Sequence, residues 1–285
     1  MICSYHSQIW QTSSCIKYNG HIWKVVEGAL IFESGYPARL ESDSSAAQIS
    51  RRRFLRRLAV IAALIGGVVS GIVGYQTFSR IARTSTKVSI PAPAKEGTMS
   101  LEEAISRRKS IRGYTAEPIS ISQLSQILGA AQGVTHDGLR SAPSAGALYP
   151  LEIYAVVKEG GVTGLQSGIH HYKPSSNTLS LTKVGDHSHE LQSASLDQEA
   201  VGSAATTIVI AAVFERTTVR YGQRGVQYVF QESGHAAQNI YLQCAALNLG
   251  SVVIGAFDEK RVRQVLGAAS NERPVYVQPI GVPSA

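Results

Sequence analysis

A-P-S-A-G-A-L-Y-P-L-E-I-Y, residues 142–154, joins a loop of small residues to an apolar segment. Small side chains at 144–147 allow backbone N–H groups to approach a planar ligand closely, although a plain surface loop has the same composition. Residues 151–157 are mostly apolar, with a partial alternation of apolar and polar side chains, and predict a strand. This stretch therefore predicts a strand preceded by a loop that is suited to contact a flat ligand.

Two helices are predicted before this loop. Ser100 and Glu103 have the spacing of a capping box, which predicts a helix that runs to about Arg108. Ser122 is expected to cap a second helix over residues 123–131, with Gly133 at its end.

Strands and helices follow the loop without simple alternation. Residues 168–172 and 179–182 predict a hairpin, and the β-branched run 206–214 predicts a central strand. Apolar residues recur at three and four positions over 228–247, which predicts the longest helix. A strand, a helix capped by Asp258 and a last strand are expected at 251–257, 259–266 and 274–282. This order of elements indicates the α+β class.

Composition and charge exclude some functions for the 285-residue chain. Charged residues make up 16% and hydrophobic residues 44%, which allows a sizeable core and argues against global disorder. The net charge of +7 comes from residues 44–95, which hold nine basic and no acidic side chains; residues 96–285 hold 15 basic and 16 acidic ones. Because a nucleic-acid-binding domain needs a basic face of its own, no nucleic-acid partner is expected.

Cysteines and histidines give no metal signature. Cys3, Cys15 and Cys244 lack zinc spacing, so no metal site is expected, and Cys244 is interpreted as a small buried residue on a helix face. His235, near the start of the long helix, is expected to be buried and hydrogen-bonded rather than catalytic. His187 and His189 are expected in an exposed polar loop.

The N-terminal part contains a candidate export signal. S-R-R-R-F-L-R at 50–56 precedes an uncharged run with four glycines, 58–79. This pattern resembles a twin-arginine export signal. An ordinary transmembrane helix is the alternative, because about 20 residues at about 1.5 Å rise span about 30 Å. Five arginines before the run would place the C-terminal domain outside the cytoplasm.

Four segments follow from these patterns. Residues 1–49 are expected to be a disordered extension, or to be absent from the natural product if translation starts later. Residues 50–83 form the signal or membrane anchor; no small-x-small cleavage site lies close to the apolar run, which favours an uncleaved anchor. The proline-containing stretch 84–97 is expected to be a linker, and 98–285 a globular domain.

Cations gather where the first helix of the domain is expected to end. Three cations and a hydroxyl lie within five positions: Arg108, Lys109, Ser110 and Arg112. Arginine offers paired donors to a phosphate, lysine a point charge and serine a further donor. Basic residues are also common at helix C-termini, so on its own this segment favours a solvated helix end.

Five motifs in order resemble the nitroreductase superfamily. They are R-R-x-S-x-R at 107–112, the 142–154 stretch, Y-G-x-R-G at 221–225, E-x-G-H-x-A-Q-N-x-Y-L at 232–242 and I-G-A-F at 254–257. More narrowly, they resemble its SagB-type branch, the peptide oxidases that form thiazoles and oxazoles. The resemblance covers nearly all of 98–285. It implies a mixed sheet flanked by helices, a homodimer with the long helix at its interface, and FMN bound between the protomers.

The resemblance also implies roles for individual residues. Four would hold the FMN phosphate and ribityl chain: Arg108, Lys109, Ser110 and Arg112. Four would approach the flavin from the partner subunit: Pro143, Ser144, Ala145 and Gly146. Two would lie against the isoalloxazine ring: Gly255 and Ala256.

One position departs from the SagB-type pattern. Azoline-oxidising members use a Lys-Tyr pair as base and proton relay, and the matching dipeptide here is Arg220-Tyr221. Arginine stays protonated and is a poor general base, which argues against azoline oxidation. Tyr221 could still orient a substrate or relay a proton; the alternative is a structural pair before the long helix.

The expected function is FMN-dependent oxidation of a small-molecule or peptide substrate outside the cytoplasm. FMN supplies hydride and electron chemistry, and the protein supplies orientation and access. NAD(P)H is scarce outside the cytoplasm, so oxygen, a quinone or a membrane carrier is the expected electron acceptor. The alternatives are an NAD(P)H-dependent nitro or quinone reductase and a non-catalytic, membrane-tethered flavin-binding protein.

Overall fold

The computed structural model describes residues 15–18, 21–26, 29–32 and 86–284, and the chain divides into two compact units, Met1–Gly71 and Ile72–Ala285. In the first unit, β1 (Cys15–Tyr18), β2 (His21–Val26) and β3 (Ala29–Phe32) form an antiparallel sheet in that order. These strands lie within residues 1–49, for which the sequence predicts an extension. β2 is rich in β-branched and aromatic residues, which favour strands.

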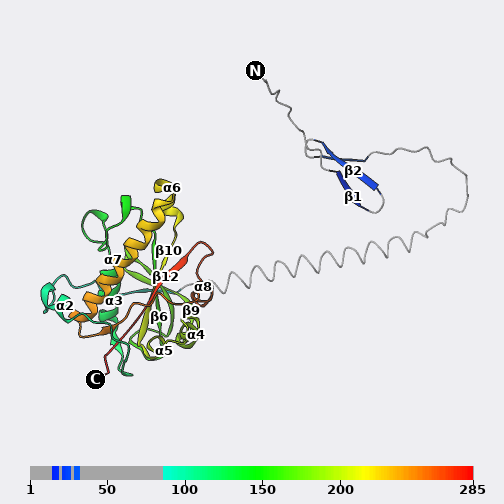
Figure 1. The fold of residues 1–285 in the computed structure, drawn as a ribbon. Helices are drawn as coiled ribbons and strands as arrows, with labels where there is room; N and C mark the ends of the chain where they lie inside the picture. The colour runs from blue at the N-terminus through cyan, green and yellow to red at the C-terminus, as the bar shows by residue number, and fades with distance from the viewer. Residues whose placement is uncertain (1–14, 19–20, 27–28, 33–85, 285) are drawn as a thin grey trace, which may run out of the picture. The chain divides into compact units, whose positions relative to one another are not determined.

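A seven-stranded sheet forms the centre of the second unit (Figure 1). Its order is β11 (Gly250–Ser251), β12 (Arg273–Gly281), β10 (Thr206–Ala212), β6 (Leu151–Val157), β8 (Gly168–Lys173), β9 (Thr178–Val184) and β4 (Lys87–Ser89). Every described pair in it is antiparallel, whereas β5 (Ile119–Ser120) pairs in parallel with β7 (Val162–Thr163). The predicted α+β class, hairpin and central strand are confirmed.

Side chains of the central strands alternate between two cores, one on each face of the sheet. Ile153 and Ile208 belong to the core under α3 (Ile121–Gln132) and α7 (Arg224–Ala246). Tyr154 and Val209 belong to the other core, under α4 (Ser188–Ala194), α5 (Glu199–Ser203) and α8 (Glu259–Leu266). Figure 1 shows these two groups of helices on opposite sides of the sheet. Burying each large aliphatic side chain contributes about 1.5–3 kcal/mol, so the alternation fixes the strand register.

Helix starts follow local capping, with one difference from the prediction. The Ser100 hydroxyl accepts a hydrogen bond from Glu103 N at the start of α2 (Leu101–Arg107), as predicted. α3 is capped by Ser120, not Ser122. Gln123 lies three residues after Ser120, donates its N–H to the Ser120 hydroxyl at 3.1 Å and accepts from Ser120 N at 2.7 Å. This reciprocal pair is available only to Ser120.

The strand expected over 251–257 is much shorter. β11 covers only Gly250–Ser251, and Ile254 adds a single bridge to Val277. The backbone groups expected to extend the ladder have other partners: Ile111 N donates to Ser251 O at 2.9 Å, and Val253 N donates to the Tyr241 hydroxyl at 2.7 Å.

Two further segments differ from the prediction: the expected linker 84–97 and the segment before α7. Within the predicted linker, Lys87–Ser89 pairs with β9 as the edge strand β4, and Ile90 is buried. The Asn177 side chain holds this segment by donating to Ile90 O at 3.2 Å and Pro91 O at 2.9 Å. An unpredicted helix, α6 (Glu215–Tyr221), precedes α7.

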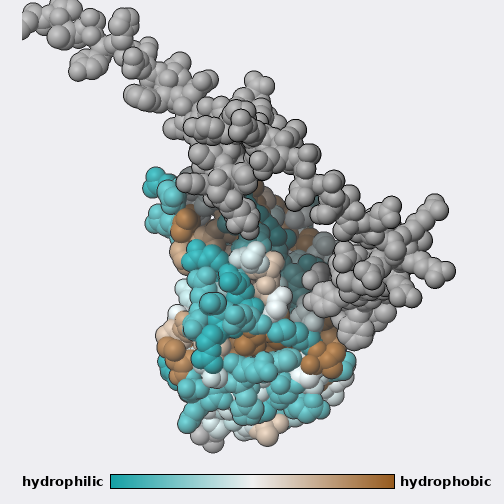
Figure 2. Space-filling view, turned by 90° about the vertical axis from the view of Figure 1, so that its right-hand side faces the viewer, coloured by the Kyte–Doolittle hydropathy of each residue, from teal (hydrophilic) through white to brown (hydrophobic). Residues whose placement is uncertain are grey.

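The predicted signal or anchor, 50–83, lies outside the described residues. In the part of the chain that the structure describes, no helix is both long and apolar enough to cross a bilayer. Figure 2 shows one face of the domain, which is mostly hydrophilic, with hydrophobic residues in separate small groups.

Candidate functional site

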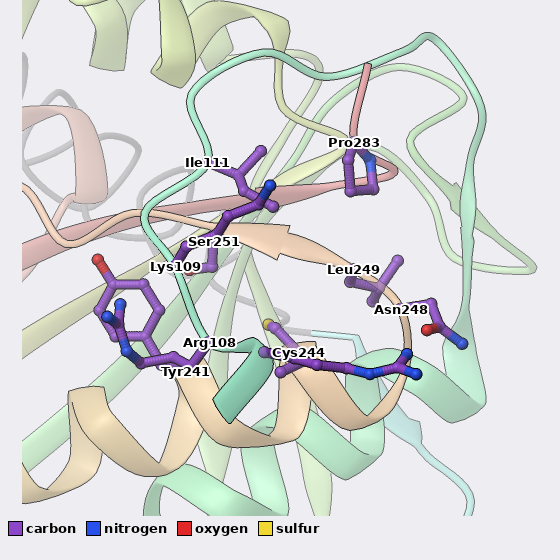
Figure 3. A pocket seen from close by; sticks show the side chains of 11 residues that line it. Arg108, Lys109, Ile111, Tyr241, Cys244, Asn248, Leu249, Ser251 and Pro283 are labelled. Carbon is purple, nitrogen blue, oxygen red and sulfur yellow. The ribbon is translucent and has the colours of Figure 1, made fainter. Parts of the chain in front are cut away.

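The basic segment after α2 lines a cavity against the C-terminal half of α7 (Figure 3). Arg108 and Lys109 border a space of about 190 Å³ together with Tyr241, Asn248 and Pro283. Ser110 Oγ lies 3.0 Å from the Tyr241 hydroxyl, and the Arg108 guanidinium lies 5.2 Å from the centre of the Tyr241 ring. Tyr241 therefore holds this segment to α7, as well as accepting from Val253 N.

The cations of this segment remain available to a ligand. Within the described residues, no carboxylate forms an ion pair with Arg108, Lys109 or Arg112. Lys109, Ser110 and Arg112 are exposed, and Arg108 is half-buried. α2 has already ended at Arg107, so these side chains extend from irregular backbone rather than from a helix face. Three free cations and a hydroxyl are a donor set suited to a phosphate group.

The 143–150 loop has a strained backbone. Gly146, Ala147 and Tyr149 have φ values of 62°, 53° and 46°, and a left-handed conformation costs a non-glycine residue about 1–2 kcal/mol. The Ser144 hydroxyl accepts from Tyr149 N at 2.9 Å, and Ala147 N donates to Ser144 O at 3.0 Å. These bonds hold the loop in shape while Pro143 and Gly146 stay exposed and Ala145 half-buried.

The Arg220-Tyr221 pair reaches this loop from the last turn of α6. A Cβ atom added at Gly146 would lie 2.8 Å from Arg220 Nη1 and 2.8 Å from the Tyr221 hydroxyl, so a larger residue would displace the ends of both side chains. The Tyr221 ring also packs edge-on against Tyr228, with centroids 5.2 Å apart. The structure therefore brings the predicted catalytic pair to the predicted flavin loop, across more than 70 residues of sequence.

Gly255 and Ala256 do not contact the 143–150 loop or the basic segment in the described structure. Both are exposed, and Ala256 O accepts a hydrogen bond from the Gln198 side chain at 3.0 Å. A Cβ atom added at Gly255 would meet only the Tyr276 ring, at 3.9 Å. Tight packing therefore does not explain this glycine. The described contacts do not join it to the loop or to the basic segment.

Glu232 is a site residue that the sequence interpretation missed. It lies on α7 with 3% of its surface exposed. Burial raises its pKa to about 7, against the opposing effects of Ser144, Arg140 and Gln132 around it. Glu232 thus places a carboxyl group beside the loop that carries Gly146. An acidic residue within the apolar pattern of a predicted helix is the signal that could have identified it.

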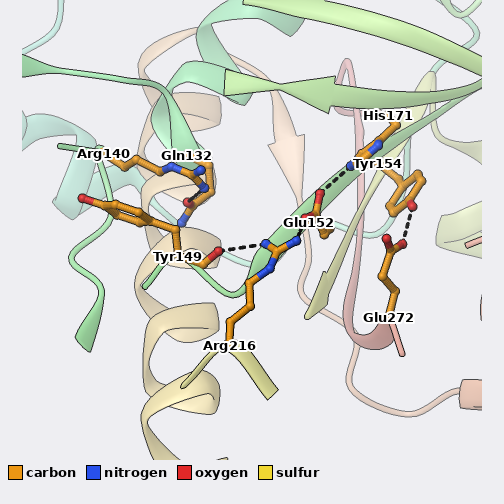
Figure 4. A network of polar contacts seen from close by, with 8 residues as sticks. All are labelled: Gln132, Arg140, Tyr149, Glu152, Tyr154, His171, Arg216 and Glu272. Atoms are coloured by element: carbon orange, nitrogen blue, oxygen red, sulfur yellow. Dashed lines mark hydrogen bonds and ion pairs between the residues drawn. The ribbon is translucent and has the colours of Figure 1, made fainter. Parts of the chain in front are cut away.

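A polar network ties α6 to the sheet (Figure 4). Glu152 on β6 binds His171 Nε2 at 2.6 Å through one oxygen and Arg216 Nη2 at 2.5 Å through the other. Burial alone would raise the pKa of Glu152, but the hydrogen bonds from His171 and Arg216 lower it to about 2. Arg216 Nη1 also donates to Tyr149 O at 3.1 Å. The sheet, α6 and the loop are therefore joined through one arginine.

Three further residues of α7 were considered in the sequence: His235, Asn239 and Cys244. His235 is exposed, so the expectation that it is buried was wrong. Asn239 donates to Ala130 O at 3.1 Å and Ser141 O at 3.3 Å, which joins α7 to α3 and to the start of the loop. Cys244 is 1% exposed, as predicted for a small buried residue.

Comparison with known proteins agrees with this geometry. Residues 105–282 match the model of the Nitroreductase family. The chain belongs to the nitroreductase family. This nitroreductase-family protein is 41% identical over 182 residues to MJ1384 of Methanocaldococcus jannaschii, which is named as a nitroreductase, and the match covers 64% of this chain and 90% of that one. It is also 27% identical over 146 residues to the microcin B17-processing protein McbC of Escherichia coli. That match covers 50% of this chain and 54% of McbC.

Solved structures agree in fold. A Ralstonia eutropha structure described as a nitroreductase has a TM-score of 0.61 at 26% identity and covers 70% of this chain and 90% of its own. An Anabaena variabilis structure described in the same way has a TM-score of 0.63 at 28% identity, and the match covers 71% of this chain but only 42% of that one. The predicted nitroreductase-like fold is confirmed, and the protein is an oxidoreductase of this family.

Proposed function

We propose that this protein binds FMN and oxidises an organic small-molecule or peptide substrate. The observation that carries the proposal is the segment Arg108–Arg112, which offers three cations and a hydroxyl that no described carboxylate neutralises. This donor set fits a phosphate, and the small residues of the 143–146 loop fit a flat ring. FMN, when bound, supplies the hydride and electron chemistry.

The chain's own residues supply orientation and proton handling. Tyr221 presents a hydroxyl beside Gly146, where it can orient a substrate or pass a proton. Arg220 offers hydrogen-bond donors and no acceptor, so it suits an anionic or carbonyl group of the substrate better than it suits proton abstraction. A peptide substrate is supported by the similarity to McbC, a microcin B17-processing protein, whereas azoline oxidation of the SagB type would need another base.

A homodimer is part of the proposal. Large apolar side chains are exposed on the helices beside the candidate site: Leu101 and Ile105 on α2, Val219 on α6 and Phe230 on α7. Exposed apolar groups of this kind are typical of surfaces that a partner covers. In such a dimer the 143–146 loop of one protomer would complete the FMN site of the other.

The proposed compartment rests on the twin-arginine-like segment, residues 50–56. With the domain outside the cytoplasm, oxygen, a quinone or a membrane carrier would accept the electrons. Alkaline phosphatase fused after Ala285 is expected to be active in intact cells. An inactive fusion that retains its folded domain would instead favour the NAD(P)H-dependent nitro or quinone reductase.

The absorption spectrum of the purified full-length chain tests the cofactor. A pair of bands near ~370 and ~450 nm is expected, with FMN identified by mass after release from the protein. Anaerobic bleaching by organic substrates but not by NAD(P)H would support the dehydrogenase, and bleaching by NAD(P)H the reductase. A colourless protein that cannot be reconstituted with FMN would leave only a non-catalytic role.

A further inference from the structure

A second polar cavity lies between β6, the end of β8 and α6. Its volume is about 240 Å³, and its polar lining includes Arg140, Glu152, Tyr172, Lys173 and Arg216. Figure 4 shows Arg216 beside Glu152 on β6, and Arg140 beside Gln132 and Tyr149. A water occupies ~30 Å³ in the liquid, so the cavity has room for on the order of eight waters. An inorganic anion or a short dicarboxylate fits within this space.

The charges that line this cavity do not balance. Three cations line the cavity with one carboxylate, Glu152, whose oxygens are already used by His171 and Arg216, while Glu232 lies near Arg140 outside the lining. Among the described residues, neither Arg140 nor Lys173 forms an ion pair. Arg140 donates Nη1 to Gln132 Oε1 at 2.9 Å, and no described hydrogen bond uses its Nη2 or Nε. Cations in excess over the carboxylates that line a partly enclosed space, with donors left unused on Arg140 and Lys173, favour a bound anion.

We propose that this cavity is a binding site for the carboxylate or phosphate group of a small anion, held by Arg140, Lys173 and Arg216. It shares no residue with the basic segment Arg108–Arg112, so it is separate from the proposed FMN phosphate site. The proposal stands whether or not the protein binds FMN, because it rests only on the cavity and its charges.

Two contacts connect this cavity to the candidate site. Arg216 donates to Tyr149 O at 3.1 Å, and the Arg140 guanidinium lies 4.4 Å from the centre of the Tyr149 ring. Tyr149 N in turn donates to the Ser144 hydroxyl, and these two residues flank Gly146 in the loop. An anion bound by both arginines would therefore hold Tyr149 from two directions and stabilise the strained loop. Arg216 is also one helical turn from Arg220 on α6.

Calorimetric titration of the full-length chain with succinate and with inorganic phosphate tests the site. Saturable binding of at least one probe is expected below ~10 mM. Lys173→Ala should weaken that binding on the order of tenfold, because it removes one charge-assisted contact from an exposed side chain. The matched control Lys260→Ala, which removes an exposed lysine from α8, should bind as the unaltered protein does.

The two probes and a further variant separate the outcomes. Dependence of succinate binding on Lys173 would identify a carboxylate site, and the same dependence for phosphate alone a phosphate site. If neither probe binds, or if Lys173→Ala binds as tightly as the unaltered protein, the proposal is overturned. Phosphate binding that is lost in Lys109→Ala but kept in Lys173→Ala would assign the anion to the basic segment and would also overturn it.

Discussion

Replacing Arg108 and Arg112 together with alanine is expected to weaken FMN binding by on the order of 10²–10⁴-fold. Each charge-assisted hydrogen bond to a phosphate contributes about 1.5–3 kcal/mol, and tenfold in affinity corresponds to about 1.4 kcal/mol. Neither arginine forms an ion pair with a described carboxylate, so their removal leaves no buried charge without a partner. The loss should therefore appear in affinity rather than in folding.

FMN fluorescence quenching during titration of the flavin-free protein measures this effect. The double variant Lys260→Ala/Arg261→Ala removes the same charge from α8 and should bind FMN as tightly as the unaltered protein. Thermal unfolding of both variants shows whether the domain remains folded. Unchanged FMN affinity in the Arg108/Arg112 variant would show that this segment does not hold the phosphate and would remove the main support for the flavin proposal.

Glu232→Gln is expected to stabilise the protein at pH 8 by up to about 3 kcal/mol. The folded-state pKa of Glu232, about 7, lies above the ordinary value of 4.5 because of burial. Between these values the folded chain holds a proton that the unfolded chain has released. The contribution of Glu232 to the free energy of unfolding is thus fully present below pH 4.5, falls as the pH rises, and is lost above pH 7.

Urea unfolding at pH 5 and pH 8 measures the difference. Glutamine resembles the protonated carboxyl group, so the variant should differ little from the unaltered protein at pH 5 and should exceed its stability at pH 8. Glu117→Gln, at an exposed position, is the control and should change little at either pH. Equal effects of Glu232→Gln at both pH values would show that the folded state does not raise the pKa of this carboxyl group.

Much of the fold was predictable because its signals are local. The β-branched run at 206–214 and the Asp258 cap of α8 needed only neighbouring residues to be recognised, and both are confirmed. The start of α3 was predicted wrongly although its signal is also local. Ser120 and Ser122 lie close together, and only Ser120 has Gln123 at the third following position. The basic segment was identifiable for the same reason: its cations are consecutive in sequence.

By itself, the sequence determined the α+β class, the order of most strands and helices, the nitroreductase resemblance and the basic segment. The individual elements and the basic segment depend on periodicity, capping or spacing within about twenty residues, and the resemblance depends on five short motifs in a fixed order. Only the tertiary structure showed that Arg220 and Tyr221 lie against Gly146. It also showed that Glu232 is buried beside the loop and that Arg216 joins Glu152 to Tyr149. Burial, pKa and ion pairing depend on groups brought together from distant parts of the chain, and no local pattern specifies those partners.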